Sequence, residues 1–213
     1  MINKDTEIYC SFAKEAGNVG CKLFNSAFNY YGLNKIYKSF SISTIGNAVD
    51  AVETLDIKGF AVTMPFKIEV LDYVDEMSDE VEHIGAANTV INHNGYLVPY
   101  NTDYLAAKEM LVDYVGSELY ILGTGGYARA VKSAANSLNL DCEFITRSDW
   151  DEIEDLKDSV IYNCTPVENI KFDKSNKFID CIVSTPTGKR LSWLQASHQF
   201  KLYTGKDLPI RNI

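Results

Sequence analysis

Residues 120–128 read YILGTGGYA, an apolar run followed by three glycines within four positions. The run has the length of a short strand, and an alanine-rich segment with helical character continues to about Leu138. A strand that ends in a glycine turn and opens a helix is the setting of the phosphate-binding turn in doubly wound α/β folds. Here Gly123 permits the tight bend, Gly125 lets backbone N–H groups approach a pyrophosphate, and Ala128 allows close packing.

The pattern therefore predicts a nucleotide-binding unit at this turn and the helix start. The residues expected there are Gly123, Gly125, Gly126, Tyr127 and Ala128. A further residue, Thr165, follows the third strand of the same lobe and is expected to border the nicotinamide. The alternative is a glycine-rich turn between a strand and a helix that binds no ligand.

The end of the next strand bears on the choice of cofactor. The triplet there consists of Thr146, Arg147 and Ser148. A site for NAD carries an acid about 20 residues after the first glycine, but here Arg147 lies 24 residues after Gly123. Because a guanidinium fork suits a 2′-phosphate, the triplet predicts NADP(H) rather than NAD(H). The alternative is a surface arginine that pairs with Asp149 or Asp151.

The rest of the chain alternates between strand-like and helix-like segments. Before residue 103 the pattern predicts strands at 7–12, 36–42 and 60–62, and a strand pair at 88–92 and 95–100. It predicts helices at 19–31, after a cap at Ser43 or Thr44, and from Pro65. After residue 103 it predicts helices at 104–115 and 191–203, and further strands at 142–145, 159–163 and 178–182.

This alternation predicts a two-lobed α/β protein. One lobe, 1–103 with 191–213, should contain a mostly parallel sheet, and the other, 104–190, should be a reduced Rossmann-like lobe that binds NADP. The lobe is called reduced because only about a dozen residues separate Ser148 from the strand at 159. The aromatic residues Phe24, Phe28 and Tyr31 recur at helical spacing and are expected in the core.

Composition excludes several classes of protein. The net charge of −9 without a basic stripe argues against nucleic acid as a partner, and no apolar run approaches the ~20 residues of a membrane span. The start of the chain shows no signal-peptide pattern. Five cysteines without C-x-x-C spacing fit reduced thiols in a cytoplasmic protein, and no Cys/His cluster suggests a metal site. Monomer and homodimer both stay open.

Three short blocks lie between residues 59 and 103: VTMPFK at 62–67, IGAANT at 84–89 and NTD at 101–103. Pro65 suits the first turn of a helix, which would place Lys67 at the positive end of the helix dipole. A residue that breaks a local rule in this way is a candidate for function. The alternatives are a solvated Lys67, a helix-capping Asp103, and turn residues at Asn88 and Thr89.

Together the blocks resemble the shikimate dehydrogenase family, which carries V-T-x-P-x-K, I-G-A-x-N-T and N-T-D in this order. The resemblance continues through the glycine turn and the triplet at 146–148, and returns at Gln195 and at 200–205. It implies an NADP-dependent dehydrogenase for a 3-dehydroshikimate-like cyclic ketone, with Lys67 as the proton donor and Asp103 as the group that orients it. It also implies hydrogen bonds to substrate hydroxyls from Thr63, Asn88 and Gln195.

The resemblance fails where the family recognises a carboxylate. Asn18 and Gly20 stand at the positions of the family's Ser-x-Ser pair, and Val183 replaces a tyrosine. Phe24 stands at the position of a family histidine. The amide of Asn18 can still donate a hydrogen bond to the substrate, while Lys22 or a backbone N–H near Gly20 could replace the serines.

The sequence thus predicts an NADP-dependent oxidoreductase that acts on a polyol ketone or acid, and this substrate is not necessarily shikimate. The rival prediction is a non-catalytic nucleotide- or metabolite-binding protein with the same fold. The reduced second lobe favours the rival, and the retained Lys67 and Asp103 oppose it.

Overall fold

Five short strands form the first sheet: β1 (Glu7–Ala13), β2 (Lys35–Ser41), β3 (Gly59–Val62), β4 (Thr89–His93) and β5 (Tyr96–Tyr100). Their order is β2-β1-β3-β4-β5. β1 is parallel to β2 and β3, whereas β4 is antiparallel to β3 and β5, so every strand except β4 points the same way. This confirms the mostly parallel sheet. Asn94 and Gly95, with φ of 57° and 95°, make the tight turn between β4 and β5.

This sheet belongs to the first of two units into which the chain divides. The computed structural model describes residues 2–209. Unit 1 comprises Met1–Thr102 and Ala196–Ile213, and unit 2 comprises Asp103–Gln195. The helix α6 (Pro186–Thr204) contributes residues to both.

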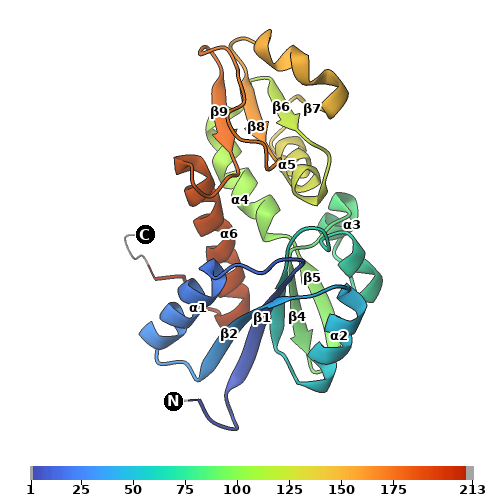
Figure 1. Cartoon of the computed structure of the whole chain (residues 1–213), viewed down its shortest axis with the longest axis vertical. Coiled ribbons are helices and arrows are strands. Elements are labelled where there is room, and N and C mark those ends of the chain that lie inside the picture. Colours follow the sequence, from blue (N-terminus) through green and yellow to red (C-terminus); the bar gives the residue numbers. More distant parts are fainter. Residues whose placement is uncertain (1, 210–213) are drawn as a thin grey trace. The chain divides into compact units, whose positions relative to one another are not determined.

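Helices cover both faces of the sheet in unit 1 (Figure 1). The crossovers through α1 (Val19–Tyr30) and α2 (Ile45–Thr54) lead in opposite directions along the sheet, so right-handed connections place them on opposite faces. The α1 face is aromatic: the rings of Tyr9, Phe24, Phe28, Tyr37, Phe200 and Tyr203 contact one another. The prediction of a core position is confirmed for Phe24 and Phe28, but Tyr31 is 36% exposed.

The α2 face is mostly aliphatic, with three phenylalanines among its buried residues. Ile45, Ala48 and Val52 of α2 pack against Cys10 and Phe12 of β1 and against residues of the neighbouring strands. The η1 3₁₀-helix (Glu69–Tyr73) and α3 (Asp79–Ile84) complete this layer through Val70 and Val81. Thr44 stands at the N-cap position of α2, but its side chain makes no capping hydrogen bond, so the predicted cap is wrong in that respect.

The helix predicted from Pro65 does not form. Residues 64–68 make consecutive turns, the Met64–Pro65 peptide bond is cis, and helical structure begins only at η1. The carbonyl of Lys67 accepts a hydrogen bond from the Ala87 N–H at 2.8 Å, which removes it from a helical ladder. Lys67 therefore does not lie in the first turn of an α-helix, and the dipole argument for it is wrong.

Unit 2 contains a second sheet in which every pair of strands is parallel. Its strands are β6 (Leu119–Leu122), β7 (Cys142–Ile145), β8 (Val160–Asn163) and β9 (Lys177–Asp180), in the order β7-β6-β8-β9. The remaining elements are α4 (Thr102–Leu111), which begins one residue before the unit boundary, η2 (Val112–Tyr114), α5 (Gly126–Ser137) and η3 (Arg147–Glu154). The four strands and the short η3 confirm the reduced Rossmann-like lobe.

The last helix is longer than predicted. α6 begins at Pro186 instead of residue 191, because proline fits the first helical position and Thr187 hydrogen-bonds the end of β9. Gly205 follows the helix with φ of 68° and donates its N–H to the Lys201 carbonyl, as expected of a glycine that ends a helix. Among residues 2–209, no helix combines the length and apolarity that a membrane crossing requires.

Candidate functional site

In unit 1, two of the predicted substrate-site segments lie side by side at the end of β3. Thr63 is exposed directly after the strand, and Lys67 is half-buried four residues later. The Val62 N–H donates to the Asn88 carbonyl at 2.8 Å, and the Ala87 N–H donates to the Lys67 carbonyl. The blocks at 62–67 and 84–89 therefore meet through their backbones. Ligands of α/β sheets collect at such carboxyl ends of strands.

Asn88 is buried, and its side-chain amide is hydrogen-bonded to other side chains and to the backbone. Its Oδ1 accepts from the Thr102 N–H at 2.8 Å and from the Thr89 hydroxyl at 3.0 Å, while its Nδ2 donates to the Thr102 Oγ1 at 2.9 Å. Gln199 donates to the Thr89 hydroxyl at 2.8 Å. Asn88 thus fixes the start of α4, and Thr89 is a strand residue instead of a turn residue.

In unit 2, the glycine turn lies where the strand order reverses between β6 and β8. Gly123 has φ of 96°, and a Cβ at this position would stand 2.9 Å from Cγ2 of Thr165. The turn therefore requires glycine, and it brings the ends of β6 and β8 together. Gly125 stands at the N-cap of α5 with open space around it, so the first-turn N–H groups of Gly126, Tyr127 and Ala128 have no side-chain cap.

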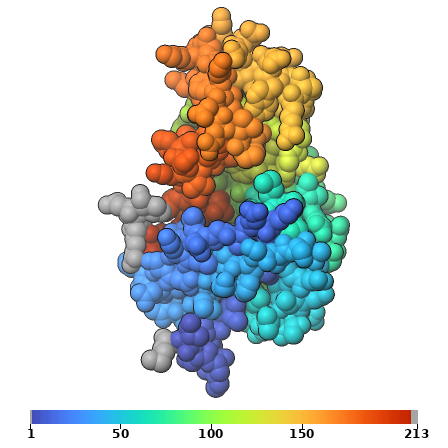
Figure 2. All heavy atoms as spheres, viewed as in Figure 1, coloured from blue at the N-terminus to red at the C-terminus, as the bar shows by residue number. Residues whose placement is uncertain are grey.

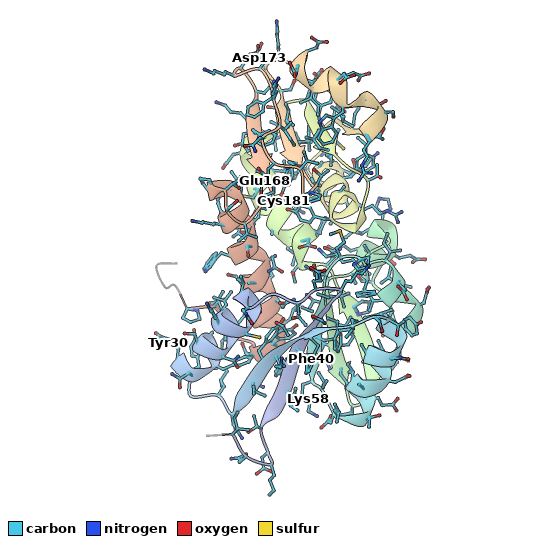
Figure 3. The ribbon with its side chains drawn as sticks, in the orientation of Figure 1. Tyr30, Phe40, Lys58, Glu168, Asp173 and Cys181 are labelled. Atoms are coloured by element: carbon cyan, nitrogen blue, oxygen red, sulfur yellow. The ribbon has the colours of Figure 1, made fainter. Side chains whose placement is uncertain are left out.

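Thr165 is held by a residue that the sequence did not single out. Asn163 is fully buried and accepts hydrogen bonds from the Thr165 N–H at 2.9 Å and its hydroxyl at 2.7 Å. Its Nδ2 donates to Asp180 of β9 and to the Val167 carbonyl. Cys181, labelled in Figure 3 after β9, lies near the Thr165 carbonyl. An isolated asparagine at a strand end gives no sequence signal of this role.

Replacing Gly123 with alanine should lower the free energy of unfolding by about 1–3 kcal/mol, the usual cost of a strained backbone position. The added Cβ meets Thr165, and φ is unfavourable for alanine. Gly125→Ala is the matched control, since φ of −71° and open space accept a Cβ. Urea unfolding should separate the two variants, and equal stability would contradict this account of the turn.

The Tyr127 side chain contacts Tyr162 of β8. Its hydroxyl hydrogen-bonds the buried Tyr162 hydroxyl at 2.9 Å. Burial raises the pKa of Tyr127 well above its usual value, with smaller contributions from Tyr162, Cys164 and the Asp103 charge. Asp103 itself is buried in the first turn of α4, so the helix-capping alternative for it is wrong.

The triplet after β7 forms the start of η3. Arg147 and Ser148 are exposed at the surface, on the segment that Figure 2 draws in yellow-orange. Thr146 stands at the N-cap and forms a capping box with Asp149. The ion pairs found among residues 2–209 do not join Arg147 to Asp149 or Asp151, so the structure does not support that alternative.

Gln195, the last of the predicted site residues, lies on α6 within unit 2. Its Nε2 donates to the Ser192 carbonyl at 3.2 Å. No group of three or more His, Cys, Asp or Glu side chains within the described residues could hold a metal ion.

We compared the chain with known protein families and proteins. Residues 19–90 match the family model described as the shikimate dehydrogenase substrate binding domain. A shikimate dehydrogenase-like protein of Haemophilus influenzae is 38% identical over 137 residues, which are 63% of this chain and 51% of that protein. In sequence, the chain is thus similar to shikimate dehydrogenases.

One further relative and one solved structure extend the comparison. A protein named shikimate dehydrogenase (NADP(+)) from Pyrococcus furiosus is 38% identical over 136 residues, 62% of this chain and 50% of that protein. The solved structure of a shikimate 5-dehydrogenase-like protein matches 99% of this chain and 95% of its own, with a TM-score of 0.82 and 28% identity. The chain spans about half the length of the curated relatives that it matches.

The structure shows the surroundings of Gly20 and Asn18, the two residues that the sequence analysis aligned with the family's serine pair. Gly20 lies in the first turn of α1, and a Cβ there would stand 3.1 Å from the ring of the buried Tyr37. Tyr37 therefore fills space beside the position that a family serine would occupy. Asn18 is exposed at the N-cap of α1, and its side chain makes no capping hydrogen bond. Val183 is half exposed in the turn before α6.

Proposed function

We propose that the protein is an NADP-dependent oxidoreductase of the shikimate dehydrogenase type that acts on a CH–OH group of a small cyclic polyol. The observation that carries the proposal is the Gly123 turn. Its missing Cβ lets the backbone pack closely against Cγ2 of Thr165, at the strand-order reversal where ligands of doubly wound sheets bind.

The residues of unit 2 fit a dinucleotide. In the proposal, Gly123, Gly125 and the first-turn N–H groups of α5 hold the pyrophosphate, and Thr165 borders the nicotinamide. The triplet Thr146, Arg147 and Ser148 faces the 2′-phosphate. When bound, the nicotinamide donates or accepts the hydride.

The other roles follow from the family motifs. Lys67 gives a proton to the oxygen that becomes a hydroxyl, or takes it back in the reverse direction, and Asp103 orients the ammonium group. Thr63, Asn88 and Gln195 contact hydroxyls of the substrate. Asn18 lies near the end of the substrate at which shikimate carries its carboxylate. The relative from Pyrococcus furiosus carries NADP(+) in its name, which supports the choice of cofactor.

Replacing Arg147 with alanine should weaken NADPH binding by about 1.5–3 kcal/mol, the range for hydrogen bonds to charged groups. The guanidinium is exposed at the start of η3, where a 2′-phosphate would accept its hydrogen bonds. NADH, which lacks the phosphate, should lose little affinity. Calorimetric titration of both dinucleotides measures the change, and an equal loss for both would show that Arg147 does not contact the 2′-phosphate.

A titration with NADPH, followed by dehydrogenase assays on a panel of cyclic hydroxy acids and polyols, tests the whole proposal. NADPH binding and turnover of one compound would support it. The second candidate is a non-catalytic dinucleotide- or metabolite-binding protein, which the four-stranded unit 2 favours. Binding without turnover of any panel member would favour that candidate, and absence of NADPH binding would contradict the proposed cofactor.

A further inference from the structure

Two cysteines lie next to each other at the carboxyl end of the second sheet. Cys164 follows β8 directly, and Cys181, labelled in Figure 3, follows β9 directly. The register pairs Asn163 with Asp180, the last residues of these two parallel strands. The two cysteines therefore occupy the next pair of positions along the strands. All five cysteines of the chain are present as thiols.

The two chain segments stay adjacent beyond their last paired residues. The Cys181 N–H donates to the Asn163 carbonyl at 3.2 Å, which continues the parallel ladder by one residue. The Cys181 thiol also donates to the carbonyl of Thr165, the residue after Cys164, at 3.7 Å. Neighbouring strands lie about 4.7–4.9 Å apart, and a disulfide needs a Cα–Cα separation of about 4.4–6.8 Å. The register thus places Cys164 and Cys181 at a separation that a disulfide can span.

The register also places both cysteines on one face of the sheet. Opposite residues of two parallel strands project to the same side, and alternate residues of one strand share a face. Cys164 therefore shares its face with Tyr162, the residue two positions before it. Burial chiefly raises the pKa of Tyr162, and Cys164 and Cys181 both add to the shift, so both thiols lie near that hydroxyl.

The exposure of this pair distinguishes it from the other cysteines. Cys164 and Cys181 are both half-buried, so a small reagent can reach them. Cys10 is fully buried, and burial raises the pKa of its thiol. Cys142 stands at the start of β7, at the opposite end of the sheet, and Cys21 lies on α1 in unit 1.

We propose that Cys164 and Cys181 form a redox-sensitive dithiol, which small disulfides such as oxidised glutathione convert to an intramolecular disulfide. The thiolate of one cysteine attacks the small disulfide, forms a mixed disulfide and expels one small thiolate. The thiolate of the other cysteine attacks the protein sulfur of this mixed disulfide and expels the second small thiolate. Two protein thiols are oxidised to one disulfide, and the small disulfide is reduced to two thiols that carry the two protons.

The disulfide changes the segment proposed to border the nicotinamide, and this consequence rests on the proposed function. Oxidation removes the S–H hydrogen that Cys181 donates to the Thr165 carbonyl, and it ties Cys164, the neighbour of Thr165, to the end of β9. A loss of the size of one neutral hydrogen bond weakens binding roughly 2- to 12-fold. We therefore expect the oxidised protein to bind NADPH less tightly by about this factor.

The bridge is tested on the full wild-type chain without reference to activity. The protein is incubated with oxidised glutathione, its thiols are counted after denaturation, and it is digested with trypsin. Lys171, Lys174 and Lys177 lie between the two cysteines, so trypsin releases Cys164 and Cys181 on separate peptides. The wild type should lose two thiols, its digest should contain these two peptides joined, and dithiothreitol should separate them.

Two variants and a titration complete the experiment. Cys164→Ser/Cys181→Ser keeps a hydroxyl donor at position 181, so it should bind NADPH like the reduced wild type before and after treatment. Cys142→Ser is the matched control: it removes another partly buried thiol of unit 2 and should still form the bridge. Calorimetry with NADPH on the reduced and oxidised proteins measures the effect on affinity.

Absence of the joined peptides from the wild-type digest, or a bridge through a different cysteine, would overturn the inference whether or not the variants fold. Unchanged NADPH affinity after the bridge has formed would overturn its effect on the dinucleotide site. These outcomes differ from failure of the proposed function. A protein that forms the bridge but binds no NADPH in either state would contradict the proposed cofactor and leave the dithiol standing.

Discussion

Replacing Lys67 with alanine should lower turnover by about 10²–10⁴-fold, the usual contribution of general acid–base catalysis. Lys67 follows β3 at its carboxyl end and is held there by the hydrogen bond between its carbonyl and the Ala87 N–H, so the variant should fold. The glycine turn lies elsewhere in the chain, and NADPH affinity should be unchanged. Steady-state rates on the true substrate and a dinucleotide titration measure both quantities.

Lys58→Ala is the matched control for this experiment. Lys58, labelled in Figure 3, precedes the other end of β3. Its ammonium pairs with Asp56, whose side chain is largely exposed. Exposed pairs contribute little, so turnover should be retained. Asp103→Asn, which keeps the shape but loses the charge, should lower turnover like Lys67→Ala. Near-normal turnover of Lys67→Ala would show that the lysine has only a structural role.

Shikimate should be a poor substrate, with a KM about 10- to 150-fold above that of a dehydrogenase with the serine pair, which corresponds to one lost hydrogen bond to a charged group. A carboxylate in a closed site needs donors. Gly20 offers only its backbone, and the ring of Tyr37 lies beside it. Substrates with a smaller or uncharged group at that end should have a higher kcat/KM.

The measurement is a steady-state comparison of shikimate with its neutral and carboxylate-modified analogues, using NADP. Asn18→Ala should weaken any remaining selectivity for the carboxylate, because Asn18 is exposed at the start of α1 and has an amide donor. Lys22→Ala tests the alternative that a lysine replaces the serines. Efficient shikimate oxidation that is insensitive to Asn18→Ala would contradict this interpretation of the pocket.

The sequence alone determined the fold class and most strands and helices, because these depend on local patterns. Alternating polarity, the Asn94-Gly95 turn and the glycine turn at 123–126 each act over a few residues. The family motifs also identified the candidate residues Lys67, Asn88 and Asp103, since their order and spacing are properties of the chain itself.

Only the tertiary structure decided how several of these residues are held. Pro65 suggested a helix, but the chain makes turns there instead. Phe66 and Val70 are buried, and the Ala87 N–H donates a hydrogen bond to the Lys67 carbonyl. The sequence around Gly20 did not predict that the ring of Tyr37 lies beside this residue.

The hydrogen bonds of Asp149 to Thr146 are a contact that the sequence did not predict. The acid expected at the end of the second strand was absent from that position, so the sequence predicted NADP(H) alone. The Thr-x-x-Asp spacing of a capping box was a signal that could have placed the carboxylate on Thr146. That placement depends on hydrogen bonds between side chains and a folded backbone turn. The local pattern thus determined the elements, and the packing of those elements determined which polar groups meet.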